Sequence, residues 1–160
     1  MIAGITGHQD LGSVDTMEWV RSELDSLVVS ERVVSGLTSL AVGADQVFAS
    51  VLQQRGLAFE VVIPSAAYES AFPSDAARAR YLELLAAASG RVALPFPEPT
   101  EQSFFEAGKY ITLHSDVLFA VWNGGPAKGL GGTADVVRFA QFQERRTIQL
   151  NPVTRTIVRL

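Results

Sequence analysis

The sequence VLFAVWNGGPAKGLGGTADVVRFA, residues 117–140, contains the pattern that decides the fold. Its first six residues, 117–122, are all apolar, which is typical of a strand that is buried on both faces. Residues 123–132 then hold five glycines and one proline, and this composition predicts a loop. An amphipathic helix is expected over 133–145. A buried strand, a glycine-rich loop and a helix in this order indicate one unit of a parallel α/β sheet.

The same alternation continues in both directions along the chain. Strands are expected over 2–6, 33–40, 59–63, 92–94 and 147–150, with a short edge strand over 156–158. Helices are expected from Asp15, where Glu18 follows at capping-box spacing, and over 44–55, 74–88 (with Ser74 as N-cap) and 101–114. The sequence therefore predicts an α/β fold, a Rossmann-like three-layer α/β/α arrangement with a mostly parallel sheet. We expect one domain over 1–160, with its ligand site at the carboxyl edge of the sheet.

Composition narrows the classes of function. The chain has 160 residues, no cysteine, two histidines and a net charge of −4. A thiolate nucleophile and a cysteine zinc site are excluded, and we expect no metal and no cofactor. Because nucleic-acid binders usually carry a basic face, we expect no nucleic-acid partner. No apolar run approaches the roughly 20 residues of a membrane span, and residues 1–5 are typical of a strand rather than a signal peptide. We therefore expect no membrane partner and a cytoplasmic protein.

Three loops that follow strands have the residues needed to hold a ligand. They cover 6–10, 39–45 and 129–133, and the last two lead directly into helices. Small residues let backbone N–H groups approach an anion, and the positive end of a helix favours negative charge. Two such helix starts at one sheet edge predict a phosphate or nucleotide site, although neither loop matches a Walker A motif or the dinucleotide fingerprint. The alternative is that these glycines only permit tight strand–helix turns.

The predicted nucleotide- and phosphate-binding residues share these loops. They are Thr6, Gly7, His8, Ser39, Gly43, Asp45, Asn123, Gly131, Gly132 and Thr133. His8 is interpreted either as a hydrogen-bond partner of phosphate or as an ordinary loop residue. Asp45 is interpreted as a helix cap, as a ribose ligand or as the acceptor of a structural hydrogen bond. Asn123 is a candidate for contact with a base or ribose. Trp122 is interpreted as a wall of the base pocket or as a core residue.

Several of these segments together resemble the SLOG superfamily, and within it the small YpsA-like proteins. The resemblance lies in Gly4-Ile5-Thr6-Gly7-His8, in Ser39-Leu40-Ala41 followed by Gly43-Ala44-Asp45, in residues 115–124 (SDVLFAVWNG) and in residues 131–135 (GGTAD). It covers nearly the whole chain. It implies a Rossmann-like fold that binds nucleotides or nucleotide-derived signals. Relatives in that superfamily include the LOG phosphoribohydrolases and the DNA-processing DprA proteins.

One position departs from the LOG pattern Pro-Gly-Gly-x-Gly-Thr-x-x-Glu. When its Gly-Thr is aligned with Gly132-Thr133, Val136 stands where the glutamate belongs. Asp135 lies one position earlier, about 100° away around a helix. The leading interpretation is therefore a module that binds or senses a nucleotide-derived small molecule. The alternative is a nucleoside-5′-monophosphate phosphoribohydrolase, in which Asp135 or Glu106 would be the catalytic carboxylate. A scaffold that acts through protein partners is a third interpretation, and DprA-like DNA processing is the last.

The expected helix over 74–88 predicts self-association. Its alanines and leucines offer more apolar surface than packing on one sheet face requires. Surplus apolar surface commonly marks an association site, and two-fold symmetry is the most frequent arrangement. We therefore expect a homo-oligomer, most simply a dimer. The alternative is that alanine occurs here only because it favours helix.

Overall fold

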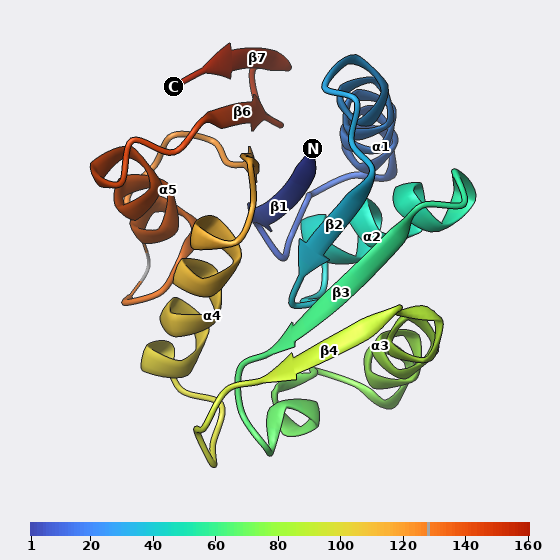
Figure 1. Cartoon of the computed structure of the whole chain (residues 1–160), viewed down its shortest axis with the longest axis vertical. Coiled ribbons are helices and arrows are strands. Elements are labelled where there is room, and N and C mark those ends of the chain that lie inside the picture. Colours follow the sequence, from blue (N-terminus) through green and yellow to red (C-terminus); the bar gives the residue numbers. More distant parts are fainter. Residues whose placement is uncertain (128) are drawn as a thin grey trace.

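The sheet is seven-stranded and almost entirely parallel. The structure is a computed structural model that describes residues 1–127 and 129–160. The strand order is β4-β3-β2-β1-β5-β6-β7, and only the β6–β7 pair is antiparallel (Figure 1). The strands are β1 (Ile2–Gly7), β2 (Ser35–Thr38), β3 (Ala58–Ile63), β4 (Gly90–Ala93), β5 (Val117–Val121), β6 (Thr147–Asn151) and β7 (Thr156–Arg159). The predicted Rossmann-like α/β fold is confirmed.

Helices cover both faces of the sheet. They are α1 (Val14–Ser30), α2 (Ala44–Gln54), α3 (Asp75–Ala87), α4 (Glu101–Leu113) and α5 (Thr133–Phe142), with a short 3₁₀ turn η1 (Tyr68–Ala71). Core residues of α1, α2 and α3 pack on one face, and those of α4 and α5 pack on the other (Figure 1). In β5, Phe119 joins the first core and Leu118 the second. A continuous apolar run suits this strand because both of its faces are buried.

The ends of several elements differ from the expectation. The N-cap of α1 is Ser13, whose hydroxyl accepts the Thr16 N–H at 3.1 Å, so the predicted start at Asp15 is wrong by two residues. The predicted cap of α3 is confirmed, because the Ser74 hydroxyl accepts the Ala77 N–H at 3.1 Å. Helix α5 ends at Phe142, three residues before the predicted end, and Glu144 has a φ of 52° that no helix can continue.

Helix α3 buries little of its apolar surface. Tyr81 and Leu84 are buried, whereas Leu82 is exposed and most of the alanines are exposed or half-buried. The exposed surface is thus mainly alanine methyl groups, and the dimer stays a prediction. No helix within residues 1–127 and 129–160 combines the length and hydrophobicity needed to cross a bilayer.

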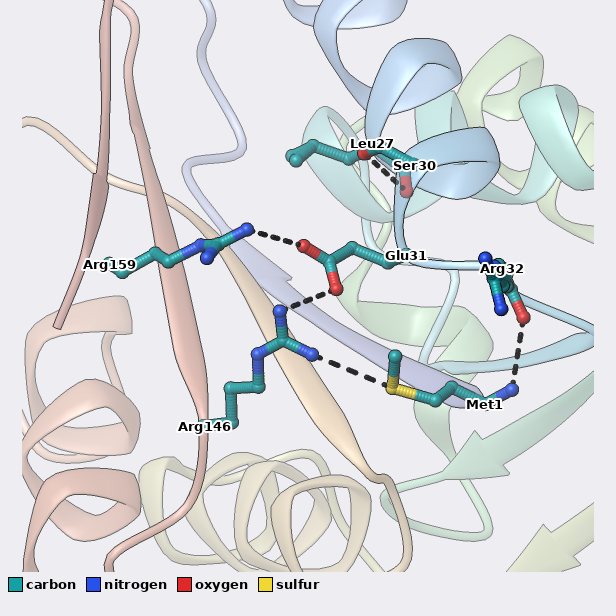
Figure 2. Close-up of polar contacts among 7 residues, drawn as sticks. All are labelled: Met1, Leu27, Ser30, Glu31, Arg32, Arg146 and Arg159. Carbon is teal, nitrogen blue, oxygen red and sulfur yellow. Dashed lines mark hydrogen bonds and ion pairs between the residues drawn. The ribbon is translucent and has the colours of Figure 1, made fainter.

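Ion pairs connect the end of α1 with residues near β6 and in β7 at the amino edge of the sheet. Glu31, directly after α1, is only 4% exposed and lies between two arginines (Figure 2). One carboxylate oxygen is 2.6 Å from Arg146 Nη2 and the other is 3.2 Å from Arg159 Nη2. The amino group of Met1 donates to the Arg32 carbonyl at 3.0 Å beside them. Because Arg159 belongs to β7, this cluster attaches the exposed edge strand to the end of α1, and the carboxyl edge of the sheet is left for a ligand.

Candidate functional site

A cavity of about 830 Å³ lies at the carboxyl ends of the central strands. The loops after β1, β2 and β5 line it, together with residues near η1 and one face of α4. Nine of the ten predicted site residues line this cavity: Thr6, Gly7, His8, Ser39, Asp45, Asn123, Gly131, Gly132 and Thr133. Parallel strands place their following loops at one edge, which is why segments far apart in sequence meet here.

Gly43 is the exception, because it does not line this cavity. Gly43 packs against the backbone of His8 and Gln9 and lines a different, smaller cavity. The first N–H of α2, from Ala44, already donates to the His8 carbonyl at 3.2 Å. The N–H of Ser39 donates to the Asp45 carboxylate at 3.0 Å. Internal acceptors therefore take the Ala44 and Ser39 N–H groups, whereas the Asp45 and Gln46 N–H groups have no acceptor among the described residues.

Asp45 is a buried carboxylate within the cavity lining. Its side chain accepts from the Ser39 N–H and, at 3.3 Å, from the Thr38 hydroxyl. Desolvation by burial raises the pKa of the Asp45 carboxyl to about 6, and the hydrogen bonds from Ser39, Ala41 and Thr38 only partly oppose this rise. Asp45 therefore forms structural hydrogen bonds, which is one of the three interpretations made from the sequence. It provides an acceptor whose charge changes between mildly acidic and neutral pH.

The raised pKa of Asp45 predicts a specific pH dependence of stability. The folded carboxyl titrates near 6 and the unfolded one near 3.8, so between these values the folded state binds more protons. The contribution of Asp45 to stability therefore falls as pH rises from about 4 to about 6. We expect Asp45→Asn to gain on the order of 2 kcal/mol relative to the wild type between pH 4 and pH 7. Urea unfolding at four pH values measures this difference, and parallel stability curves for the two proteins would contradict it.

His8 and Asn123 connect the first and third loops. The Asn123 N–H donates to His8 Nε2 at 3.1 Å. The His8 ring therefore accepts through Nε2, which leaves Nδ1 as the nitrogen available to donate. The Asn123 side-chain oxygen accepts the Gly125 N–H at 2.9 Å, and the Trp122 indole N–H donates to the Gly125 carbonyl at 2.8 Å. These bonds fix the Trp122 ring, which lines the cavity, at the end of β5.

The start of α5 lines the cavity. Its N-cap, Gly132, has no side chain to cap the helix. The Gly131 N–H donates to Asp135 at 3.1 Å, whereas the N–H groups of Thr133 and Ala134 find no acceptor in the part of the chain that the structure describes. All four residues of 131–134 line the cavity. N–H groups without an acceptor at the positive end of a ten-residue helix are suited to an anion.

Glu101 holds the glycine loop in place, and the sequence analysis missed it. Its carboxylate accepts the Leu130 N–H at 3.3 Å from the first turn of α4. Gly131 packs on the same turn, because a Cβ there would lie 2.6 Å from the Glu101 carbonyl oxygen. Nothing local in the sequence indicates this pairing, since the residues are about thirty positions apart and meet only when α4 packs beside α5.

The two candidate catalytic carboxylates lie elsewhere. Glu106 is 2.6 Å from Lys109 Nζ, and Asp135 pairs with Arg138 as well as with the Gly131 N–H. Neither is among the described residues that line the cavity. Val136 does line it, and a Cβ on the neighbouring Gly108 would lie 2.5 Å from the Val136 side chain. The position of the expected glutamate is thus an aliphatic contact between α5 and α4.

An aromatic wall closes one side of the cavity. Tyr68 lies 5.2 Å from Phe72 and 6.2 Å from Phe104, measured between ring centres, and all three line the cavity. Burial, with a smaller effect of the Asp45 carboxylate, raises the pKa of Tyr68 well above its usual value, so the phenol stays neutral. The wall therefore offers apolar ring surface suited to stacking.

The charge of the lining limits what the cavity can accept. Asp10 and Asp45 line it, and no lysine or arginine does so among the described residues. No group of three or more His, Asp or Glu residues in residues 1–127 and 129–160 is arranged to hold a metal ion. An anion here must rely on backbone N–H groups and the dipole of α5.

No protein-family model matches the chain, and no curated protein matches it. Solved structures with the same fold include DNA processing protein A from Streptococcus pneumoniae (TM-score 0.66, 16% identity, covering 92% of this chain and 49% of that one). DNA processing protein A from Helicobacter pylori, solved for its single-stranded DNA binding mode, is also similar. The TM-score is 0.65 and the identity 14%, and the match covers 93% of this chain and 64% of that one. The molybdenum cofactor carrier protein from Chlamydomonas reinhardtii also matches, with a TM-score of 0.60 and 16% identity. This match covers 94% of this chain and 75% of that one. The chain spans about half the length of the pneumococcal protein.

These comparisons correct one expectation. The net negative charge led us to expect no nucleic-acid partner, and that expectation is wrong, since a protein of the same fold binds single-stranded DNA. Net charge averages over the whole surface and does not describe one edge of a sheet. The chain has the Rossmann-like fold shared by these DNA-processing and cofactor-carrier proteins, which is the fold implied by its resemblance to the SLOG superfamily.

Proposed function

We propose that the chain binds a small nucleotide with a single phosphate in the main cavity. The observation that carries this proposal is the start of α5, where the Thr133 and Ala134 N–H groups are without an acceptor among the described residues and line the cavity. A phosphate at that position would receive hydrogen bonds from the backbone and the favourable field of the helix.

The remaining parts of a nucleotide have matching surfaces. The aromatic wall of Tyr68, Phe72 and Phe104 suits a base, which stacks on ring faces. Asp45 and Ser39 are polar lining residues suited to ribose hydroxyls. Because Asp10 and Asp45 line the cavity, each additional phosphate would meet unfavourable charge, and this supports a monophosphate rather than a triphosphate.

The structural neighbours support use of this fold for binding. One is described by its single-stranded DNA binding mode and another as a cofactor carrier. Cleavage of an N-glycosidic bond, the alternative function, has less support. It needs a carboxylate near the sugar, and both candidates, Asp135 and Glu106, form ion pairs outside the cavity lining.

Ligand-induced stabilisation tests this function. We expect AMP, GMP, CMP or UMP at about a hundred times its Kd to add about 2.7 kcal/mol to the free energy of unfolding. For a chain of this size that corresponds to a rise in Tm of roughly 5–10 °C. The matched nucleoside without phosphate and the matched triphosphate should both bind more weakly, and calorimetry compares their Kd values.

Three results would contradict the proposal. The first is the absence of stabilisation by every monophosphate, and the second is equal affinity for nucleoside and nucleotide. The third is tighter binding of a short single-stranded oligonucleotide than of any mononucleotide, which would indicate that single-stranded DNA is the ligand of this site. Release of free base during the assay, detected by chromatography, would favour the phosphoribohydrolase alternative.

A further inference from the structure

A second cavity of about 320 Å³ lies beside the main one. It is bounded by the starts of α1 and α2 and by Arg80 of α3. These three helices cover one face of the sheet (Figure 1). Gln9 and Val42 line both cavities, so the two are separated only by the loops after β1 and β2. Neither the resemblance nor the comparisons assign a role to this second cavity.

The charge of the second cavity is opposite to that of the main cavity. Its described lining includes two arginines, Arg21 and Arg80, and no carboxylate. This is unexpected in a chain of net charge −4, in which acidic residues outnumber basic ones. Two guanidinium groups directed at one cavity repel each other unless an anion lies between them.

Arg80 is held in position by its neighbours. One of its terminal nitrogens donates to the Ser50 hydroxyl at 2.8 Å, and the other is 2.9 Å from the Glu83 carboxylate on the same helix. Glu83 is largely exposed, so this pair is solvated and leaves much of the guanidinium charge uncompensated. Two other carboxylates are engaged elsewhere, since Asp25 pairs with Arg55 at 2.5 Å and Asp10 accepts the Gly12 N–H.

Arg21 carries the decisive observation. Its Nη1 atom is buried and has no hydrogen-bond partner among the described residues, and no ion pair of Arg21 is found there. A buried guanidinium N–H without an acceptor costs folding free energy, so buried polar groups nearly always have a partner. No hydrogen bond or ion pair within residues 1–127 and 129–160 engages the other nitrogens of the Arg21 guanidinium, and the residue lines the second cavity. An anion in that cavity would give the Arg21 side chain the partner of opposite charge that it lacks.

We propose that the second cavity binds a phosphate-type oxyanion, either free phosphate or the phosphate of a small ester, through Arg21 and Arg80. Guanidinium groups bind phosphate oxygens with strong, directional hydrogen bonds. The Ser13 N-cap places the positive end of the seventeen-residue helix α1 at the same cavity, which adds to the favourable field. Leu11, Met17 and Val47 complete the lining with apolar surface that suits a short organic group on the phosphate. This site is independent of nucleotide binding in the main cavity.

The test uses inorganic phosphate and glycerol 3-phosphate as probes in phosphate-free buffer. Calorimetry and thermal unfolding are compared for the wild type, Arg21→Gln, Arg80→Gln and a matched control, Arg78→Gln, which removes the same charge from an exposed position of α3. We expect Arg21→Gln and Arg80→Gln each to weaken binding at least about tenfold, as the loss of a charge-assisted hydrogen bond requires. Arg78→Gln should change the Kd less than about twofold. The probe with the lower Kd shows whether the site prefers free phosphate or a phosphate ester.

Two further measurements separate this site from alternatives. Without a probe, Arg21→Gln should have a Tm equal to or above that of the wild type, because the variant removes an unpartnered buried donor. Gly131→Ala, which alters the main cavity, should leave phosphate binding at this second site unchanged. The proposal is overturned if the wild type binds neither probe, if all three arginine variants lose affinity equally, or if binding is lost in Gly131→Ala and kept in Arg21→Gln.

Discussion

Gly43→Ala is expected to lower the free energy of unfolding by about 4 kcal/mol, the sum of backbone strain and overpacking. Gly43 has a φ of +94°, which L-residues rarely adopt. A Cβ at this position would also overlap the carbonyl oxygens of His8 and Gln9. These are backbone atoms, so relief requires the loop after β1 to move away from the start of α2. Urea unfolding at neutral pH measures the change.

Gly12→Ala and Gly56→Ala are the matched controls for this prediction. Both positions have positive φ, of +79° and +67°, but an added Cβ finds no atom within 4 Å at either. In these two variants the free energy of unfolding should therefore fall by about 1 kcal/mol, from backbone strain alone. A Gly43→Ala variant that is no less stable than these two would show that the contact between the two loops is not needed for the fold.

The sequence predicted the fold well because the core patterns are local. The apolar run at 117–121 and the amphipathic pattern of α2 need no knowledge of the rest of the chain. Errors occurred where a terminus depends on one hydrogen bond or one backbone angle. Ser13 rather than Asp15 caps α1, and β2 begins only at Ser35 because Arg32, with a φ of 53°, turns the chain after α1.

The site was predictable only to the level of its loops. Strand–loop–helix order places the loops at one edge, and nine of the ten predicted residues line the cavity for that reason. Which N–H groups remain free could not be predicted. The set of free N–H groups depends on hydrogen bonds between residues far apart in sequence. Examples are the Ala44 N–H to the His8 carbonyl and the Leu130 N–H to the Glu101 carboxylate. Arg21 and Arg80 were missed for the same reason, since only the packing of α1, α2 and α3 brings them to one cavity.

The change expected to affect nucleotide binding most is Gly131→Ala, with a loss of affinity of about a hundredfold, or about 2.7 kcal/mol. Gly131 has a φ of +84°, and an added Cβ would lie 2.6 Å from the Glu101 carbonyl oxygen and 2.9 Å from the Phe105 nitrogen. Because both contacts are backbone atoms of α4, the glycine loop must shift outward. That shift would carry the Thr133 N–H away from the proposed phosphate position, and calorimetry with the tightest-binding monophosphate measures the loss.

Gly124→Ala is the control in the same loop region. Its φ is +85°, almost the same as that of Gly131, but the nearest atom to an added Cβ is Gln149 Nε2 at 3.8 Å. It therefore carries the same backbone strain without displacing the loop from α4. If phosphate binds at the start of α5, Gly131→Ala loses affinity and Gly124→Ala keeps it, while urea unfolding shows both variants folded. Wild-type affinity in both folded variants would place the ligand away from α5. Equal losses of affinity in both would mean that strain anywhere in this loop disrupts the cavity.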